Sequence, residues 1–92
     1  MSMLGLRFAG GRMLVIDGKP VGELMYLRGS GPPVAVCVTR LDGAAGPLRV
    51  DTRRDLRLAS WTDGRHAYVV VGELDEQAAV DIADLVAAQL RG

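Results

Sequence analysis

A chain of 92 residues with 49% hydrophobic and 24% charged residues has the size and composition of one globular domain with a modest core. Its formal net charge of zero excludes the long-range attraction that proteins binding nucleic acid or anionic membranes use. A single cysteine cannot form an internal disulfide, so cysteine usage does not indicate the redox compartment. We predict a single domain over residues 1–92.

The N-terminal residues predict short strands joined by glycine-containing turns. Apolar side chains alternate with others from Leu4 onward, and Gly10-Gly11 then predicts a hairpin turn. Asp17-Gly18 predicts the next turn, because Asp-Gly favours the positive φ angles that two-residue hairpin loops need. Residues 22–28 are expected to form the strand that follows, so this half of the chain indicates a meander.

The strand predicted at residues 34–39 is apolar on both faces, which is typical of a strand in the middle of a sheet. The side chains of its second face are small, and we expect them to leave room for a helix. Residues 41–47 then predict a loop, and residues 48–52 a short strand. The two faces of the central strand hold Val34, Val36 and Val38 on one side and Ala35, Cys37 and Thr39 on the other.

The stretch around Asp63-Gly64 predicts a tight hairpin between two strands. A two-residue loop at this pair would place Trp61 opposite His66 and Ala59 opposite Tyr68. Alternation along the two strands then separates two faces. The first face gathers Leu56, Leu58, Ala67, Val69 and Val71, and the second gathers Trp61, His66 and Tyr68.

Residues 75–90 predict an amphipathic helix. Asp75 is a good N-cap because its carboxylate can accept hydrogen bonds from the N–H groups two or three residues on. All the elements together predict an α+β fold, in which an antiparallel meander sheet of about five or six strands has one C-terminal helix packed across it. The apolar stripe of the helix consists of Ala78, Ala79, Ile82, Leu85, Val86 and Leu90.

The second face of the hairpin offers candidate binding residues. Aromatic side chains with polar tips anchor ligands and protein partners well, so Trp61, His66 and Tyr68 form the candidate binding site. The alternative is that this face lies under the helix or a loop and forms part of the core.

Cys37 and His66 are the only residues of their kinds, and they raise a metal or redox hypothesis that Met3, Met13 and Met25 would extend. A simpler interpretation is that Cys37 and the methionines fill gaps in the core, while His66 packs on a ring across the hairpin. We therefore expect no metal site and no cofactor.

No catalytic arrangement is indicated by the sequence. Gly10-Gly11 and residues 29–31 do not stand between a strand and a helix, so neither is expected to form a phosphate loop. The one Cys and the one His lie far apart in the sequence, and no pair of nucleophile and base can be named. We expect a protein that is not an enzyme and has no nucleic-acid partner.

A family pattern runs through residues 55–90. Trp61 precedes a short polar turn, an alternating run containing Tyr68 follows, and the step Gly72-Glu73-Leu74 leads into a helix rich in Ala and Leu. This order of elements resembles the C-terminal end of the extracytoplasmic region of membrane-bound anti-sigma factors of the zinc-dependent class. The upstream segments 10–14 and 24–26 fit the same family.

The resemblance implies a role in transcription regulation in a bacterium. Such anti-sigma factors hold an extracytoplasmic-function sigma factor inactive through a cytoplasmic domain with a His and paired Cys zinc motif, which one membrane span follows. One Cys, one His and no apolar run near the roughly 18 residues of a span mean that these 92 residues resemble the outer domain alone. We expect that domain on the periplasmic side of the inner membrane, with no membrane insertion of its own.

The expected partners are proteins: a second copy, a regulatory protease or a sensor partner. The sigma factor would be contacted only through the N-terminal region of the parent protein. The first residues show no export signal, so the alternative is a stand-alone small-molecule-binding or dimerisation module of the cytoplasm.

Overall fold

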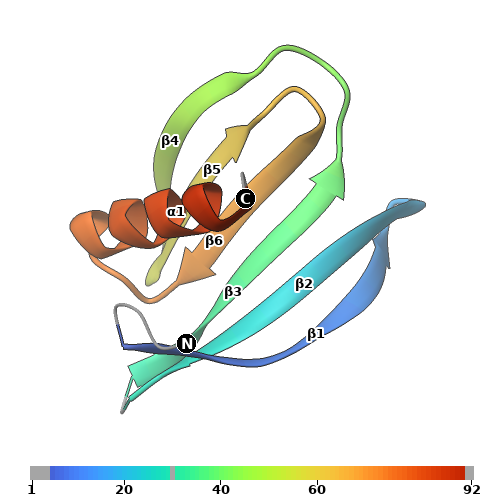
Figure 1. Cartoon of the computed structure of the whole chain (residues 1–92). Helices are drawn as coiled ribbons and strands as arrows, with labels where there is room; N and C mark the ends of the chain where they lie inside the picture. Colours follow the sequence, from blue (N-terminus) through green and yellow to red (C-terminus); the bar gives the residue numbers. More distant parts are fainter. Residues whose placement is uncertain (1–4, 30, 91–92) are drawn as a thin grey trace.

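A six-stranded antiparallel sheet with one C-terminal helix across it forms the fold of this chain in a computed structural model (Figure 1). The structure describes residues 5–29 and 31–90, so Met3 and Leu4 lie outside the described residues. The predicted α+β class is confirmed. The elements are β1 (Leu6–Ile16), β2 (Lys19–Arg28), β3 (Gly31–Arg40), β4 (Gly46–Arg53), β5 (Leu56–Thr62), β6 (His66–Gly72) and α1 (Glu76–Leu90).

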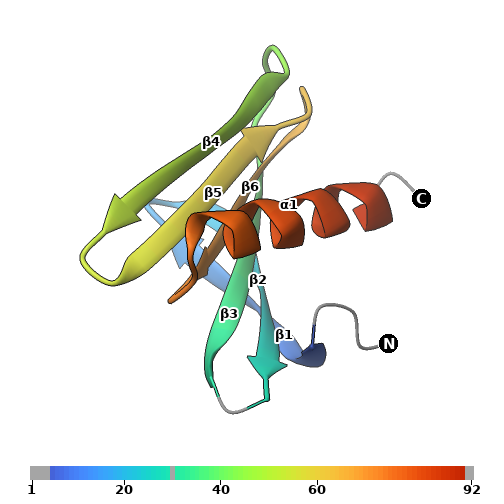
Figure 2. The same cartoon turned by 90° about the vertical axis from the view of Figure 1, so that its left-hand side faces the viewer.

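The strand order in the sheet is β1-β2-β3-β6-β5-β4. Two three-stranded meanders therefore meet at the pair formed by β3 and β6, and the meander in chain order is broken at this one place. β3 has neighbours on both sides, as its two apolar faces predict, while β1 and β4 are the edges. Figure 2 shows α1 running beside β5 and β6, and the helix lies against β4, β5 and β6.

The core is a row of small and branched side chains under the helix. Residues directly opposite one another in neighbouring strands point to the same face of a sheet. Val36 lies opposite Val70, which lies opposite Ala59, and all three are almost completely buried. From α1, four side chains complete this buried cluster: Ala79, Ile82, Ala83 and Val86.

The helix lies on the side of the sheet to which the valines of β3 point, whereas the sequence predicted room for it on the face of Ala35 and Cys37. The valine face includes Val34 and Val36, and Val36 lies in line with Val70 on β6, so a helix on this side removes a row of valines from water. The opposite face of the sheet faces away from α1.

The passage from β6 to α1 depends on a close contact at Gly72. A Cβ on this residue would lie 3.2 Å from side-chain atoms of both Val34 and Leu74, so glycine lets the chain turn tightly against the core. Leu74 is buried. The Asp75 carboxylate accepts a hydrogen bond of 2.7 Å from the Ala78 N–H, which confirms the predicted N-cap.

Two glycine-containing turns were predicted in the N-terminal half, and only one of them exists. Asp17 and Gly18 have φ angles of 51° and 77°, as a tight hairpin loop requires, so this turn is confirmed. Gly10-Gly11 does not reverse the chain, because β1 continues through it with a register shift between Phe8 and Gly10. The glycines instead accommodate a β-bulge, in which Gly10 has a φ of 143°.

We expect Ile82→Ala to lower the free energy of unfolding by about 2–5 kcal/mol, because the side chain is buried against the sheet and its removal leaves a cavity. Asp84→Ala on the exposed face of the same helix is the matched control and should change stability by about 0.5 kcal/mol or less. Urea unfolding followed by tryptophan fluorescence measures both variants. Equal stability of the two would contradict the packing of α1 on this face.

Candidate functional site

The β5–β6 hairpin brings the predicted binding residues to one face with a different register from the predicted one. Trp61 lies opposite Tyr68, while His66 lies opposite Arg40 of β3, so the predicted Trp61–His66 pair is wrong. The register is displaced by two residues because the turn is longer than two residues. A displacement of two preserves the side-chain alternation, so the three aromatic residues still share a face.

Asp63 determines the shape of this turn. One carboxylate oxygen, Oδ1, accepts hydrogen bonds from the backbone N–H groups of Arg65 at 2.9 Å and His66 at 2.8 Å. The other oxygen, Oδ2, accepts a hydrogen bond from the Tyr68 hydroxyl at 2.8 Å. The backbone also closes the turn with a bond from the Asp63 N–H to the His66 carbonyl. In place of the predicted two-residue loop, the chain forms a longer turn in which the Asp63 carboxylate accepts three hydrogen bonds.

These hydrogen bonds alter the acidity of both groups. The backbone donors of Arg65 and His66, followed by the Tyr68 hydroxyl, lower the pKa of Asp63 from 3.8 to about 2. Burial raises the pKa of Tyr68, and the hydrogen bond to the Asp63 carboxylate raises it further. At neutral pH the pair is therefore an ionised acceptor and a neutral donor. This protonation state suits a structural hydrogen bond better than proton transfer.

The aromatic cluster, which consists of Trp61, His66 and Tyr68, is partly core and partly surface. Tyr68 is only 6% exposed, and the Trp61 ring stacks on it with centroids 5.1 Å apart and an interplanar angle of 20°. The His66 ring is tilted by 43° relative to the Tyr68 ring, with the two centroids 6.1 Å apart. Trp61 also packs against the core, so Tyr68 and part of Trp61 are held by the fold itself.

A shallow hollow of about 360 Å³ lies next to the aromatic cluster. Trp61 and His66 are both half-buried, so part of each ring faces solvent. A contact with a ligand or protein through these rings remains a prediction. The hollow is lined by Val38, Asp63, Arg65, His66 and Tyr68.

The loop between β3 and β4 is attached to the same turn. The Leu41 N–H donates to the Arg65 carbonyl at 2.8 Å, and the Gly43 N–H donates to the Gly64 carbonyl at 3.3 Å. On the β5 side, the Thr62 hydroxyl donates to the Ala44 carbonyl at 3.2 Å. Sequence reasoning did not anticipate this contact, because both segments show only turn-forming residues and no pattern that indicates which turns meet.

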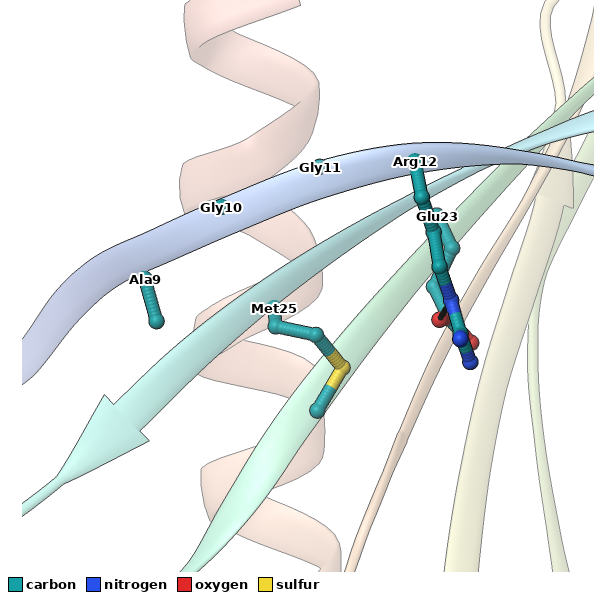
Figure 3. Close-up of a pocket in the computed structure, with 6 residues that line it drawn as sticks. All are labelled: Ala9, Gly10, Gly11, Arg12, Glu23 and Met25. Carbon is teal, nitrogen blue, oxygen red and sulfur yellow. Dashed lines mark hydrogen bonds and ion pairs between the residues drawn. The ribbon is translucent and has the colours of Figure 1, made fainter.

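A second groove, of about 320 Å³, lies at the β-bulge of β1. Figure 3 shows Ala9, Met25, Arg12 and Glu23 pointing to the same side of the β1–β2 ribbon. Arg12 Nε lies 2.6 Å from Glu23 Oε1, so the groove has an ion pair at one end and the Met25 thioether near the other. The sequence did not indicate this groove, because Gly10-Gly11 was assigned to a turn.

The surface of the sheet on the side away from α1 is named the open face. In the described part of the chain no helix lies on it, and its central side chains are predominantly apolar. Cross-strand pairing places Cys37 opposite Val69, and Ala35 opposite Val71. The open face is defined by Met25, Ala35, Cys37, Leu58, Val69 and Val71.

The structure does not bring together the residues of the metal hypothesis. Cys37 lies on the open face, whereas His66 lies on the helix side of the sheet, and Met13 and Met25 are on opposite faces of the β1–β2 hairpin. Burial, followed by the nearby Glu23, raises the pKa of the Cys37 thiol, which disfavours the reactive thiolate. Within residues 5–29 and 31–90 no group of three or more His, Cys, Asp or Glu side chains is arranged to hold a metal ion.

Comparison with protein-family models, with curated proteins and with solved structures finds no match to this chain. The one helix of the described residues is neither long enough nor apolar enough to span a bilayer.

We expect the stability of the folded chain to fall between about pH 4 and pH 2, in part because of Asp63. Its pKa is lowered on folding, so its contribution is present above the usual value of 3.8 and is lost as the pH falls through about 2. Asp63→Asn removes the charge, so the variant should lose less stability over this interval than the original chain. Urea unfolding at pH 5 and pH 2 measures the difference. The exposed Asp55→Asn is the control, and an identical pH response of Asp63→Asn and the original chain would contradict the prediction.

Proposed function

We propose that this domain is a non-catalytic regulatory domain, the extracytoplasmic part of a membrane-bound anti-sigma factor of the zinc-dependent class. The observation that supports it is that the residues of the family pattern contact one another or the core in the structure. Trp61 stacks on Tyr68, Gly72 allows close approach to the core, and Leu74 is buried before the Asp75 cap. Each position of the pattern thus has a role in joining one hairpin to one helix.

The open face supports a role in protein contact. Exposed apolar surface on one side of a sheet is typical of protein interaction sites. Around the centre of this face, Ile16, Leu27 and Leu56 leave substantial apolar area accessible to solvent. In the proposed function, a sensor partner or a regulatory protease recognises this surface on the periplasmic side of the inner membrane.

The domain would regulate by a change of occupancy or conformation. A partner that binds only one state of the domain shifts the population toward that state, and the shift is limited by its difference in affinity for the two states. Release of the sigma factor would then follow from altered access of a protease to the parent protein. The sigma factor itself would be held by a separate cytoplasmic region of that parent.

A stand-alone small-molecule-binding or dimerisation module of the cytoplasm is the second candidate function. The groove at the β-bulge favours it, because Arg12, Glu23 and Met25 combine an ion pair with an apolar wall. The full reading frame discriminates the two candidates. An upstream membrane span and a His/Cys zinc motif would favour the anti-sigma factor, and their absence from the gene would favour the module.

Deletion of residues 5–90 from the parent gene is expected to change the activity of the sigma factor, measured with a promoter-reporter fusion. Val69→Lys, which places a charge on the open face, should change reporter activity in the same direction if this face receives the partner. Thr52→Lys on the exposed edge strand β4 is the matched control. Thermal unfolding confirms that both variants fold. Unchanged reporter activity after the deletion would contradict the proposed function.

A further inference from the structure

The edge strand β1 presents exposed apolar side chains along its length, and its second half has no bulge. Met13 and Val15 are 69% and 76% exposed, and Phe8 and Ile16 are also more than half exposed. Among the strands of residues 5–29 and 31–90, β2 is the one neighbour of β1 (Figure 1). Sheet edges with such side chains pair readily with another strand unless charges, proline or a bulge prevent it.

The opposite edge of the sheet carries these protective features. β4 has Pro47 near its start and a register shift between Gly46 and Arg49. Arg49, Asp51 and Arg53 place charges along the remainder of that strand. In β1 the bulge lies near Ala9, so it protects the first half only. Residues 10–16 are therefore the part of the edge that remains available.

The backbone of this part shows which residues can pair outward. The two-residue turn at Asp17-Gly18 makes Ile16 and Lys19 a hydrogen-bonded pair. Hydrogen-bonded pairs alternate along an antiparallel ladder, so the even-numbered residues of this segment bond to β2. The N–H and C=O groups of Gly11, Met13 and Val15 then point away from the sheet. Two of these three residues, Met13 and Val15, also carry the most exposed large apolar side chains of the strand.

We propose that β1 pairs with β1 of a second copy of this chain, antiparallel and with Met13 opposite Met13 on the two-fold axis. In this register Val15 of each copy lies opposite Gly11 of the other. The branched valine side chain then faces a glycine, which has no side chain to collide with it. Arg12 lies opposite Leu14, and no like charges face each other directly. Arg12 remains paired with Glu23 of its own chain.

The two-fold registers centred on Arg12 and on Gly11 are less favourable. A register centred on Arg12 would place two arginines opposite each other and would use backbone groups already bonded to β2. A register centred on Gly11 would extend into the bulge and lose ladder hydrogen bonds. The favoured pairing joins two six-stranded sheets into one continuous sheet, with both helices on the same face. This inference concerns the chain itself and does not depend on the proposed function.

Light scattering coupled to size exclusion tests the association over a range of concentrations. We expect the mass to rise toward twice the 9.8 kDa of one chain. Met13→Lys should return it to one chain, because two charges would face each other at the axis. Thr52→Lys, the same kind of change on the β4 edge, should leave the association intact. A monomer at every concentration overturns the proposal, as does a dimer that Met13→Lys does not weaken.

Cross-linking tests the register. In a Cys37→Ser background, Met13→Cys places two thiols on opposed residues whose Cα atoms are about 5.5 Å apart, within reach of a disulfide. Leu14→Cys places them diagonally at about 7–8 Å, beyond that reach. Mild oxidation should therefore link the first variant and leave the second unlinked. Equal linkage of both variants, or linkage of Leu14→Cys alone, overturns the register.

Discussion

The packing of α1 on β4, β5 and β6, in a core cluster that also includes the valines of β3, is the interaction on which the rest of this fold depends. Val36, Val70 and Ala59 are almost completely buried, in one cluster with Ile82 and its helical neighbours. A helix of 15 residues is about 22 Å long, while six strands span about 24 Å across the sheet and extend beyond the helix along their own length. One helix therefore covers part of one face. The helix does not lie against β1, and the open face carries no helix in the described residues.

The Asp63 turn is the second point at which the structure is strongly constrained. A single carboxylate satisfies two backbone donors of the turn and the hydroxyl of a buried tyrosine. This arrangement connects the turn to the aromatic cluster and, through the Leu41 and Gly43 backbone bonds, to the loop before β4. The polar groups at this end of the sheet serve mainly to hold segments together. The open face and the β1 edge, which we propose for partners, lie elsewhere.

The proposed regulatory role would act through contacts with other proteins. A binding domain needs a rigid support and an accessible surface, and the sheet supplies both, because its helix side is packed and its other side is not. The family resemblance was carried by residues of the packed side. The resemblance therefore concerns the architecture. A partner would be recognised by side chains outside the pattern.

The sequence by itself determined the features that depend on short-range geometry. The Asp17-Gly18 turn follows from positive φ angles, the start of α1 from the Asp75 cap, and the central position of β3 from its two apolar faces. The aromatic cluster also shares a face as predicted, because side-chain alternation survives a displacement of two residues.

Only the tertiary structure decided the features that depend on contacts between distant segments. These are the pairing of β3 with β6, the face that α1 covers, the longer turn at Asp63 and the bulge at Gly10-Gly11. Glycine pairs suit turns and bulges equally well, so local preference cannot distinguish them. The two faces of β3 are both apolar, and the choice between them rests on how much area the whole fold buries. Which face is buried depends on contacts between residues far apart in the chain, and these contacts exist only in the folded protein.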